Sequence, residues 1–310
     1  MLIDFRGKVA IVTGAGHGLG KSYALFLASR GAKVIVNDLG TSEDGSSRSQ
    51  EPAQKVTELI VERGGTAVAN FNSVADPDEA GRIVDETLRH FGTVDILINN
   101  AGILRDRSFL KMTHDDFALV LRVHLLGSVY TTHAAFPVMK RKGYGRIVLT
   151  TSIAGLYGNF GQTNYGAAKM GLIGFMNSLK IEGKKHNILV NTVAPLAVTR
   201  LAEASGVFSG DISSALQPEH VTPLVAYLCS EACQTSGDIL CAGGGFFARA
   251  QIVESPGLRF DREKGVTPEV IAENFAAIRN MAGAQPFQDT KEELAVSLGP
   301  LFHSEMLRKE

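Results

Sequence analysis

Cysteine is scarce in this chain of 310 residues, which contains only Cys229, Cys233 and Cys241. Such a sparse, odd set suits a reducing compartment and argues against a small disulfide-bonded scaffold. Cys229 and Cys233 have helical spacing and could be read as metal ligands, but no matching Cys/His pair accompanies them. We therefore expect buried free thiols and no metal site.

A strong charge of one sign and long hydrophobic runs are also lacking. The formal net charge is −1 and hydrophobic residues make up 45% of the chain. Bulk charge therefore gives no indication of nucleic-acid binding. The apolar stretches are short and interrupted by charged residues, so we expect no membrane span. Asp4, Arg6 and Lys8 break the first segment, which excludes a secretory signal there.

Short apolar runs alternate with helical runs along the chain. The strands are expected near residues 9, 34, 67, 96, 147, 189 and 239. This alternation predicts an α/β fold, in which a doubly wound, parallel, seven-stranded sheet of the Rossmann type is covered on both faces. Such sheets bind ligands at the carboxyl ends of their strands.

A glycine-rich turn from Thr13 to Gly20 lies between an apolar strand and a helical run. Its glycines allow a tight turn and a close approach to a pyrophosphate at the positive end of the helix. The next strand ends in Asp38, where a carboxylate would bind the adenosine ribose hydroxyls and repel a 2′-phosphate. This favours NAD over NADP. The alternative is that Asp38 is only a turn residue before Gly40.

A second motif combines Ser152, Tyr165 and Lys169. Tyr165 and Lys169 are four residues apart, so on a helix they share one face. A nearby ammonium lowers the pKa of a phenol, which can then exchange a proton with a carbinol or carbonyl oxygen. Ser152 follows an apolar strand, and its hydroxyl can bond the same oxygen. A chance helical pair is the alternative, and the glycine turn makes it improbable.

Together with the turn Asn99-Asn100-Ala101-Gly102, these motifs resemble the short-chain dehydrogenase/reductase family over roughly residues 5 to 250. The resemblance implies that Tyr165 is the acid/base, that Lys169 also holds the nicotinamide ribose, and that Ser152 orients the substrate oxygen. It assigns NAD binding to Gly14, Gly16, Gly18, Leu19, Gly20, Asp38, Ser73, Val74, Asn100, Ala101, Gly102, Tyr165, Lys169 and Pro195.

Three departures from the family pattern narrow this interpretation. The loop from Leu39 to Glu51 is long, His124 stands where most members have Asn, and a tail of about sixty residues follows the last strand. These features resemble the (3R)-hydroxyacyl-CoA dehydrogenase unit of the peroxisomal multifunctional enzyme type 2 family, also known for 17β-hydroxysteroid dehydrogenase type 4. The resemblance implies NAD-dependent oxidation of (3R)-3-hydroxyacyl-CoA to 3-ketoacyl-CoA.

Two alternative functions stay open. One is oxidation of a steroid alcohol, as in a 17β-hydroxysteroid dehydrogenase. The other is a non-catalytic NAD-sensing regulator on the same fold, which the complete Ser152, Tyr165 and Lys169 set disfavours. The chain ends at Arg308-Lys309-Glu310 without a peroxisomal address, so we expect a stand-alone, cytoplasmic enzyme of bacterial type. We expect a homodimer or homotetramer.

The remaining candidates concern the substrate. His124 either lies on a helix surface or packs, or it replaces Asn in supporting a helix break and a proton path, and we count it among the catalytic candidates. Candidates for the CoA phosphates are Arg48, Arg105, Arg107 and Arg249. We expect a dehydrogenase domain over 1–250 and an extension over 251–310 packing near the substrate channel. In the extension, a helix from Pro268 to Met281 should bury one apolar face. The stretch from Leu201 to Gln217 offers little bulk to close over a ligand.

Overall fold

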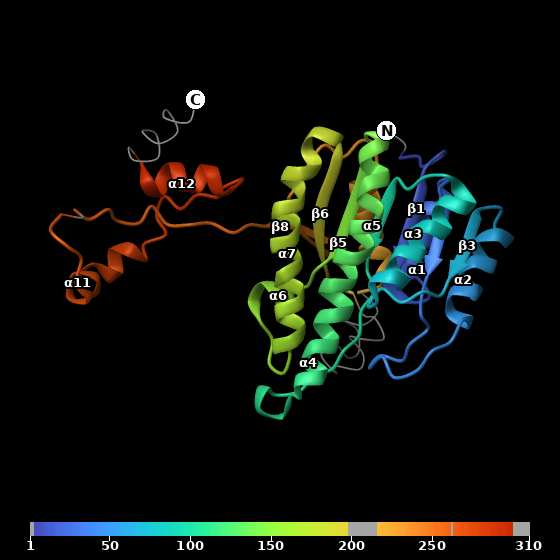
Figure 1. Cartoon of the computed structure of the whole chain (residues 1–310), viewed down its shortest axis with the longest axis horizontal. Coiled ribbons are helices and arrows are strands. Elements are labelled where there is room, and N and C mark those ends of the chain that lie inside the picture. Colours follow the sequence, from blue (N-terminus) through green and yellow to red (C-terminus); the bar gives the residue numbers. More distant parts are fainter. Residues whose placement is uncertain (1–2, 198–215, 262, 300–310) are drawn as a thin grey trace. The chain divides into compact units, whose positions relative to one another are not determined.

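The computed structural model describes residues 3–197, 216–261 and 263–299. Strands and helices alternate through most of this chain (Figure 1). The strands are β1 (Val9–Thr13), β2 (Lys33–Asn37), β3 (Thr66–Asn70), β4 (Ile96–Asn99), β5 (Gly145–Thr150), β6 (Ile188–Pro195), β7 (Ile239–Gly243) and β8 (Phe246–Ala250). The α-helices are α1 (Gly18–Ser29), α2 (Glu51–Glu62), α3 (Pro77–Phe91), α4 (His114–Leu121), α5 (Gly127–Lys142), α6 (Ile153–Tyr157), α7 (Thr163–Gly183), α10 (Thr222–Cys229), α11 (Pro268–Ile278) and α12 (Thr290–Leu298).

The strands form one sheet in the order β3-β2-β1-β4-β5-β6-β7-β8. Every pairing from β3 across to β7 is parallel. Val12 of β1 lies level with Val36 of β2 on one side and with Ile98 of β4 on the other. The chain order therefore reverses at β1 and β4, where doubly wound sheets bind their ligands. The predicted fold class is confirmed.

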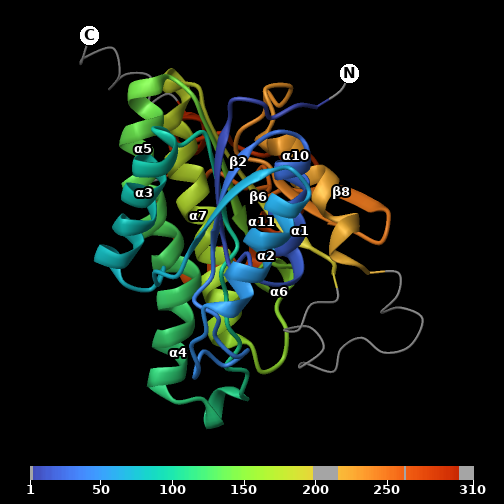
Figure 2. The same ribbon diagram turned by 90° about the vertical axis from the view of Figure 1, so that its right-hand side faces the viewer.

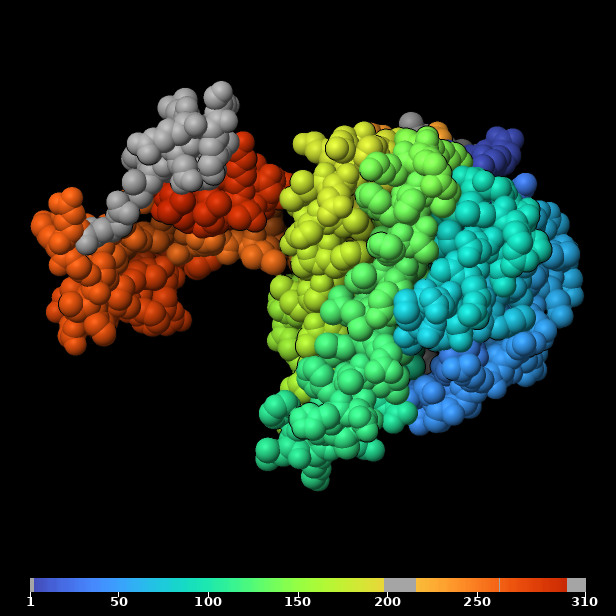
Figure 3. Space-filling model, in the orientation of Figure 1, coloured from blue at the N-terminus to red at the C-terminus, as the bar shows by residue number. Residues whose placement is uncertain are grey.

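Helices cover both faces of the sheet. α1, α2 and α10 pack together on one face, and α3, α5 and α7 lie on the other (Figures 1 and 2). The outer surface of α3, α5 and α7, coloured cyan to yellow-green, faces the viewer in Figure 3. The sheet is thus sandwiched, which explains why β1, β4 and β5 are mainly apolar and buried at every position.

The prediction of seven strands missed β8. This strand follows β7 after only Gly244 and Gly245, both of which have positive φ. Two residues are enough for a hairpin and far too few for a parallel crossover. A hairpin at the end of a parallel sheet leaves no helical period to detect, and β8 is only partly buried.

Residue contacts divide the chain into two compact units, Met1–Arg249 and Ala250–Glu310. In the second unit, α11 begins where expected because Thr267 caps it, its side chain accepting a hydrogen bond from the Val270 backbone N–H. The expected buried face of this helix is not present in the single chain. No residue of α11 is buried, and the helix ends at Ile278 rather than at Met281.

The three cysteines are buried free thiols, as expected. Within the described residues, no helix combines the length and the apolar character that crossing a bilayer requires. The described part of the chain also places no three His, Cys, Asp or Glu side chains together in a way that could hold a metal ion.

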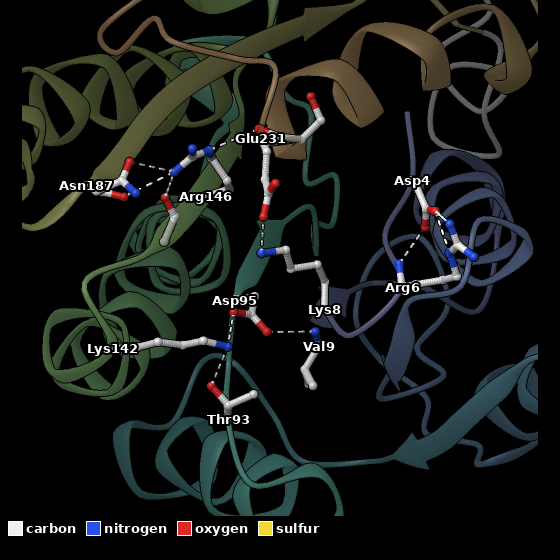
Figure 4. A network of polar contacts seen from close by, with 12 residues as sticks. Asp4, Arg6, Lys8, Val9, Thr93, Asp95, Lys142, Arg146, Asn187 and Glu231 are labelled. Carbon is white, nitrogen blue, oxygen red and sulfur yellow. Dashed lines mark hydrogen bonds and ion pairs between the residues drawn. The ribbon is translucent and has the colours of Figure 1, made fainter. Parts of the chain in front are cut away.

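The amino ends of the central strands are held together by Asp95 (Figure 4). Its fully buried carboxylate accepts a hydrogen bond from the Val9 backbone N–H at 2.9 Å and pairs with Lys142 of α5. The backbone of Asp95 also bonds Val9 and Arg146, the latter in β5. One residue therefore joins β1, β4, β5 and α5 at the end of the sheet that faces away from the ligand-binding edge.

We expect Asp95→Ala to lower the free energy of unfolding by about 2–4 kcal/mol, because it strips the Val9 N–H and the Lys142 ammonium of a buried acceptor. Chemical denaturation checks this. The matched control is Arg6→Ala, which removes the Asp4–Arg6 pair at the surface, also visible in Figure 4. Arg6→Ala should leave the midpoint unchanged. Equal midpoints for both variants and the wild type would contradict the role of Asp95.

Candidate active site

A cleft of about 610 Å³ opens at the carboxyl ends of the parallel strands. It is lined by segments that follow β1, β2, β3, β4, β5 and β6. The fold therefore brings together residues that are spread along the chain from Gly14 to Ala197. The predicted site residues that line it are Gly14, Gly18, Leu19, Asp38, Ser73, Val74, Asn100, Ala101, Gly102, His124, Ser152, Tyr165, Lys169 and Pro195. Of the predicted set, only Gly16 and Gly20 lie behind this lining.

These two glycines support the turn from behind. A Cβ on Gly20 would lie 2.2 Å from the Gly14 carbonyl oxygen, so α1 can approach the turn this closely only without a side chain there. A Cβ on Gly16 would lie 2.8 Å from Asp38 Oδ2. Gly14 itself has φ +63°, a conformation that favours glycine. Close packing at Gly16 and Gly20 and the positive φ of Gly14 therefore explain why these three positions require glycine.

The carboxylate of Asp38 accepts two backbone hydrogen bonds, from Gly16 N at 2.7 Å and from Gly40 N at 2.6 Å. It is therefore a turn residue, which was the alternative interpretation, and it also faces the cleft. The two roles are compatible because a carboxylate has about four lone-pair sites. The bonds hold the negative charge at the cleft wall, close to the glycine turn.

Asn100 and Thr13 join β1 to β4 at the edge of the cleft. The Asn100 side-chain amide donates to the Thr13 carbonyl at 3.0 Å and to the Gly14 carbonyl at 3.1 Å. In return, Thr13 Oγ1 accepts from the backbone N–H of Asn100 and of Ala101. This reciprocal set satisfies groups that the parallel ladder leaves unpaired where the strands diverge.

The long loop after β2 is anchored across the cleft to the segment after β4. Leu104 N donates to the Glu43 carbonyl at 2.9 Å, and Arg105 Nε donates to the Asp44 carbonyl at 2.6 Å. Arg105 also pairs with Asp116 of α4 at 3.0 Å. The Arg105 guanidinium is thus already bonded within the protein, which argues against its binding a CoA phosphate.

The other candidate arginines are dispersed. Arg48 lines the cleft, Arg107 is exposed, and Arg249 pairs with Asp238 at 2.9 Å. The structure therefore does not gather the four arginines into one cluster. The predicted small-residue stretch from Leu201 to Gln217 lies almost wholly outside the described residues.

Ser152, Tyr165 and Lys169 meet at the inner end of the cleft. Ser152 follows β5 and caps α6, its hydroxyl accepting from Ala154 N at 3.1 Å, and it also hydrogen-bonds the Tyr165 phenol. Lys169 lies one turn further along α7, its Nζ 5.5 Å from the centre of the Tyr165 ring. The Lys169 ammonium donates to the Thr150 carbonyl at the end of β5.

The electrostatics of this group correct one expectation. Burial raises the pKa of Tyr165 to about 12, although the Ser152 hydrogen bond opposes the rise. Burial also lowers the pKa of Lys169 to about 7, so near neutral pH its amine is only partly charged. The four-residue spacing places Lys169 beside Tyr165 as expected, but burial dominates and the pKa of Tyr165 is raised rather than lowered.

His124 is buried, with 2% of its surface exposed, which excludes a helix-surface role. It lies in a π-helical turn, η2 (Arg122–Leu126), so the helix break expected at this position is present. Its Nε2 is 2.8 Å from the Ile103 carbonyl oxygen, and its ring meets that of Tyr165 edge-on. A Cβ on Gly102 would lie 2.3 Å from the ring, so Gly102 makes room for it. Burial first, and then the charge of Lys169, lower the pKa of His124 well below its usual value.

Sequence reasoning missed a polar pair next to Tyr165. Gln162 lines the cleft and donates through Nε2 to Asp106 Oδ2 at 2.6 Å. Burial raises the pKa of Asp106, and its charge contributes to the raised pKa of Tyr165. The two residues are 56 positions apart, and only the proximity of Gln162 to Tyr165 in the sequence could have drawn attention to it.

Known proteins similar to this chain belong to the family of short-chain dehydrogenases or contain such a unit. The family model for short chain dehydrogenase matches residues 8–205. Peroxisomal multifunctional enzyme A of Dictyostelium discoideum is 49% identical over 280 residues, which are 90% of this chain and 62% of that protein. The chain thus spans less than two thirds of this relative.

Two solved structures extend the comparison. Full-length peroxisomal multifunctional enzyme type 2 from Drosophila melanogaster has a TM-score of 0.81 and 38% identity, covering 96% of this chain and 50% of that one. A 7α-hydroxysteroid dehydrogenase complexed with NADH and 7-oxo glycochenodeoxycholic acid has a TM-score of 0.70 and 29% identity, covering 78% and 95%.

We expect Tyr165→Phe to reduce alcohol oxidation by roughly 10² or more, because the ring stays and the proton acceptor is lost. Oxidation needs the phenolate, and the pKa of Tyr165 is about 12, so the wild-type rate should rise with pH above neutrality. The variant should lose this rise. Steady-state rates between pH 6 and about 10 measure both effects.

The matched control is Tyr144→Phe. Burial also raises the pKa of Tyr144 to about 12, but this tyrosine lies beside Lys8 and Arg146 at the opposite end of β5. Its variant should keep the wild-type rate and pH profile. Near-normal turnover in Tyr165→Phe would refute the proton-transfer role.

Proposed function

The chain belongs to the short-chain dehydrogenase family, and on this premise we propose that it oxidises (3R)-3-hydroxyacyl-CoA thioesters to 3-ketoacyl-CoA with NAD. The observation that carries the proposal is the convergence in one cleft of Ser152, Tyr165 and Lys169 at one end and the Asp38 carboxylate at the other. A cleft of this kind can hold a dinucleotide along its length and leave its reactive end beside a proton acceptor.

The residues present fit a dinucleotide. The amino end of α1 follows directly on the glycine turn, and the cleft there is lined by Gly14, Gly18 and Leu19. Asp38 would accept the adenosine ribose hydroxyls, and Lys169 would hold the nicotinamide ribose. When bound, NAD supplies the hydride acceptor for the substrate carbon. The remaining contacts would come from Ser73, Val74, Asn100, Ala101, Gly102 and Pro195.

The protein's own part in the reaction is to hold an oxygen and move a proton. Ser152 donates a hydrogen bond to the substrate hydroxyl oxygen, and Tyr165, as phenolate, takes the hydroxyl proton. With a pKa of about 7, the Lys169 amine can gain or lose a proton near neutral pH, so it can pass protons onward from Tyr165. His124 keeps the Tyr165 ring and the Ile103 backbone in place.

Two considerations support an acyl-CoA substrate. Several relatives that match nine tenths or more of this chain are named as peroxisomal multifunctional enzymes. The long loop, His124 and the C-terminal tail are the features in which the chain resembles their dehydrogenase unit. The second candidate is a hydroxysteroid, because the more distant 7α-hydroxysteroid dehydrogenase was solved with a 7-oxo bile acid. A non-catalytic NAD sensor is less favoured, since it would not need a complete catalytic set.

We further propose that the enzyme is a homodimer or homotetramer in the cytoplasm. Members of the family usually form oligomers, and the three buried free thiols suit a reducing compartment.

For the cofactor, we expect the kcat/KM for NAD to exceed that for NADP by well over tenfold, which corresponds to about 1.4 kcal/mol or more. The reason is repulsion between Asp38 and a 2′-phosphate. Asp38→Ala should narrow the gap. Asp85→Ala, which removes one carboxylate from the exposed surface of α3, should leave it unchanged. Equal kcat/KM values for NAD and NADP in the wild type would contradict the role of Asp38 in selecting NAD.

For the substrate, we expect kcat/KM for a medium- or long-chain (3R)-3-hydroxyacyl-CoA to exceed that for a 17β-hydroxysteroid, with the (3S) epimer nearly inert. Contacts to the remote acyl and CoA groups position the reacting carbon, so truncated thioesters should lose kcat as well as affinity. Steady-state kinetics of all substrates on one preparation test this. A kcat/KM ten times higher for the steroid than for the thioester would refute the acyl-CoA proposal in favour of a hydroxysteroid dehydrogenase.

A further inference from the structure

Gln162 is held at both ends of its side-chain amide. Its Nε2 donates to Asp106 Oδ2 at 2.6 Å, and its Oε1 accepts from Asn159 Nδ2 at 3.0 Å. Only 9% of its surface is exposed. Gln162 directly precedes α7 and stands three residues before Tyr165. The amide therefore sits on the same short stretch of chain as the proton acceptor.

The partners of Gln162 determine which way its amide points. The Asn159 nitrogen can only donate, so it requires the Gln162 oxygen on its side. Asp106 Oδ2 accepts, so it requires the Gln162 nitrogen on the other side. Both contacts agree on one orientation, and a flipped amide would lose both bonds.

One N–H of Gln162 is left for a ligand. Its Nε2 carries two hydrogens, and Asp106 is the only acceptor recorded for them among residues 3–197, 216–261 and 263–299. Gln162 lines the cleft together with Ser152 and Tyr165. Asp106 Oδ1 is buried without a hydrogen-bond partner, so within the part of the chain that the structure describes the carboxyl is bonded through Oδ2 to Gln162.

We propose that Gln162 donates this N–H to the thioester carbonyl oxygen of the substrate, with Asp106 as the positioning residue. The inference rests on the proposed function. In a 3-hydroxyacyl thioester the carbonyl carbon lies two bonds from the carbon that loses hydride. Ser152 and Tyr165 bind the hydroxyl oxygen, so Gln162 supplies a second fixed polar contact at a short distance along the same chain.

This second contact gives the site a means of selecting the epimer. With the hydroxyl and the carbonyl both fixed, only one configuration at C3 directs its hydrogen toward the hydride acceptor. A hydroxysteroid has no carbonyl at this spacing and leaves the Gln162 N–H unpaired. A site built to bond a particular polar group discriminates strongly against a ligand that lacks it.

The test compares a (3R)-3-hydroxyacyl-CoA with its thioether analogue, in which a methylene replaces the carbonyl. In Gln162→Met, which keeps the side-chain length and loses the donor, the ratio of kcat/KM for thioester over thioether should fall by about tenfold. The (3R)/(3S) preference should fall with it. The kcat/KM for the thioether and the affinity for NAD should stay near wild type, which also shows that the variant folds.

Three further variants separate the possible causes. Gln162→Asn keeps an amide but shortens the side chain by one methylene, so the thioester-over-thioether ratio of kcat/KM should fall in this variant as well. Asp106→Asn removes the negative charge and one of the two acceptor oxygens, which weakens the hold on the Gln162 amide, so it should reduce the ratio partly. Thr163→Val alters the exposed neighbour of Gln162 and should leave the ratio unchanged. A wild-type ratio in both Gln162 variants overturns the inference alone. A wild type that oxidises no hydroxyacyl thioester overturns the proposed function and the inference with it.

Discussion

The whole site depends on the bonded junction between β1 and β4. There the parallel strands part, and Thr13 and Asn100 exchange backbone and side-chain hydrogen bonds across the gap. This junction sets the position of the glycine turn. The turn then holds Asp38, because Gly16 N donates a hydrogen bond to the Asp38 carboxylate. It also fixes the start of the segment that carries Gly102 and Ile103 to His124. A single set of partly buried hydrogen bonds thus orients both halves of the cleft.

Burial governs the chemistry at the inner end of this cleft. Tyr165, Lys169 and His124 all shift their pKa values toward the neutral form, and desolvation is the first cause in each case. Groups so arranged cost stability, because each would be better hydrated in the unfolded chain. At the opposite end of the strands, Asp95 joins three strands and α5. The groups that can exchange protons and the Asp95 junction therefore lie at opposite ends of the same parallel strands.

The polar groups of the substrate side are bonded to one another. Asp106 and Asn159 fix Gln162, while Ser152 bonds Tyr165. The segment after β4 is shared between the two sides, since Arg105 reaches the loop after β2 and Asp106 reaches Gln162. Fixing donors in advance reduces the reorganisation needed when a ligand binds.

The sequence by itself determined the features that depend on local order. Alternating apolar runs gave the parallel sheet, the glycine spacing gave the turn, and the four-residue spacing of Tyr165 and Lys169 gave their shared face. Such patterns record the period of an element and its neighbours along the chain. The cap at Thr267 could be predicted for the same reason.

Only the tertiary structure decided the rest, because those features join residues that are far apart in the chain or depend on burial. Asp106 is hydrogen-bonded to Gln162, 56 positions away, and Asp95 to Val9, 86 positions away. No periodic pattern in the sequence predicts either contact. The direction of the Tyr165 pKa shift depends on the burial of the site and, after that, on the charge of Asp106. The sequence named the reacting groups, and the three-dimensional packing set their charge states and partners, since solvent exclusion is a property of the folded chain.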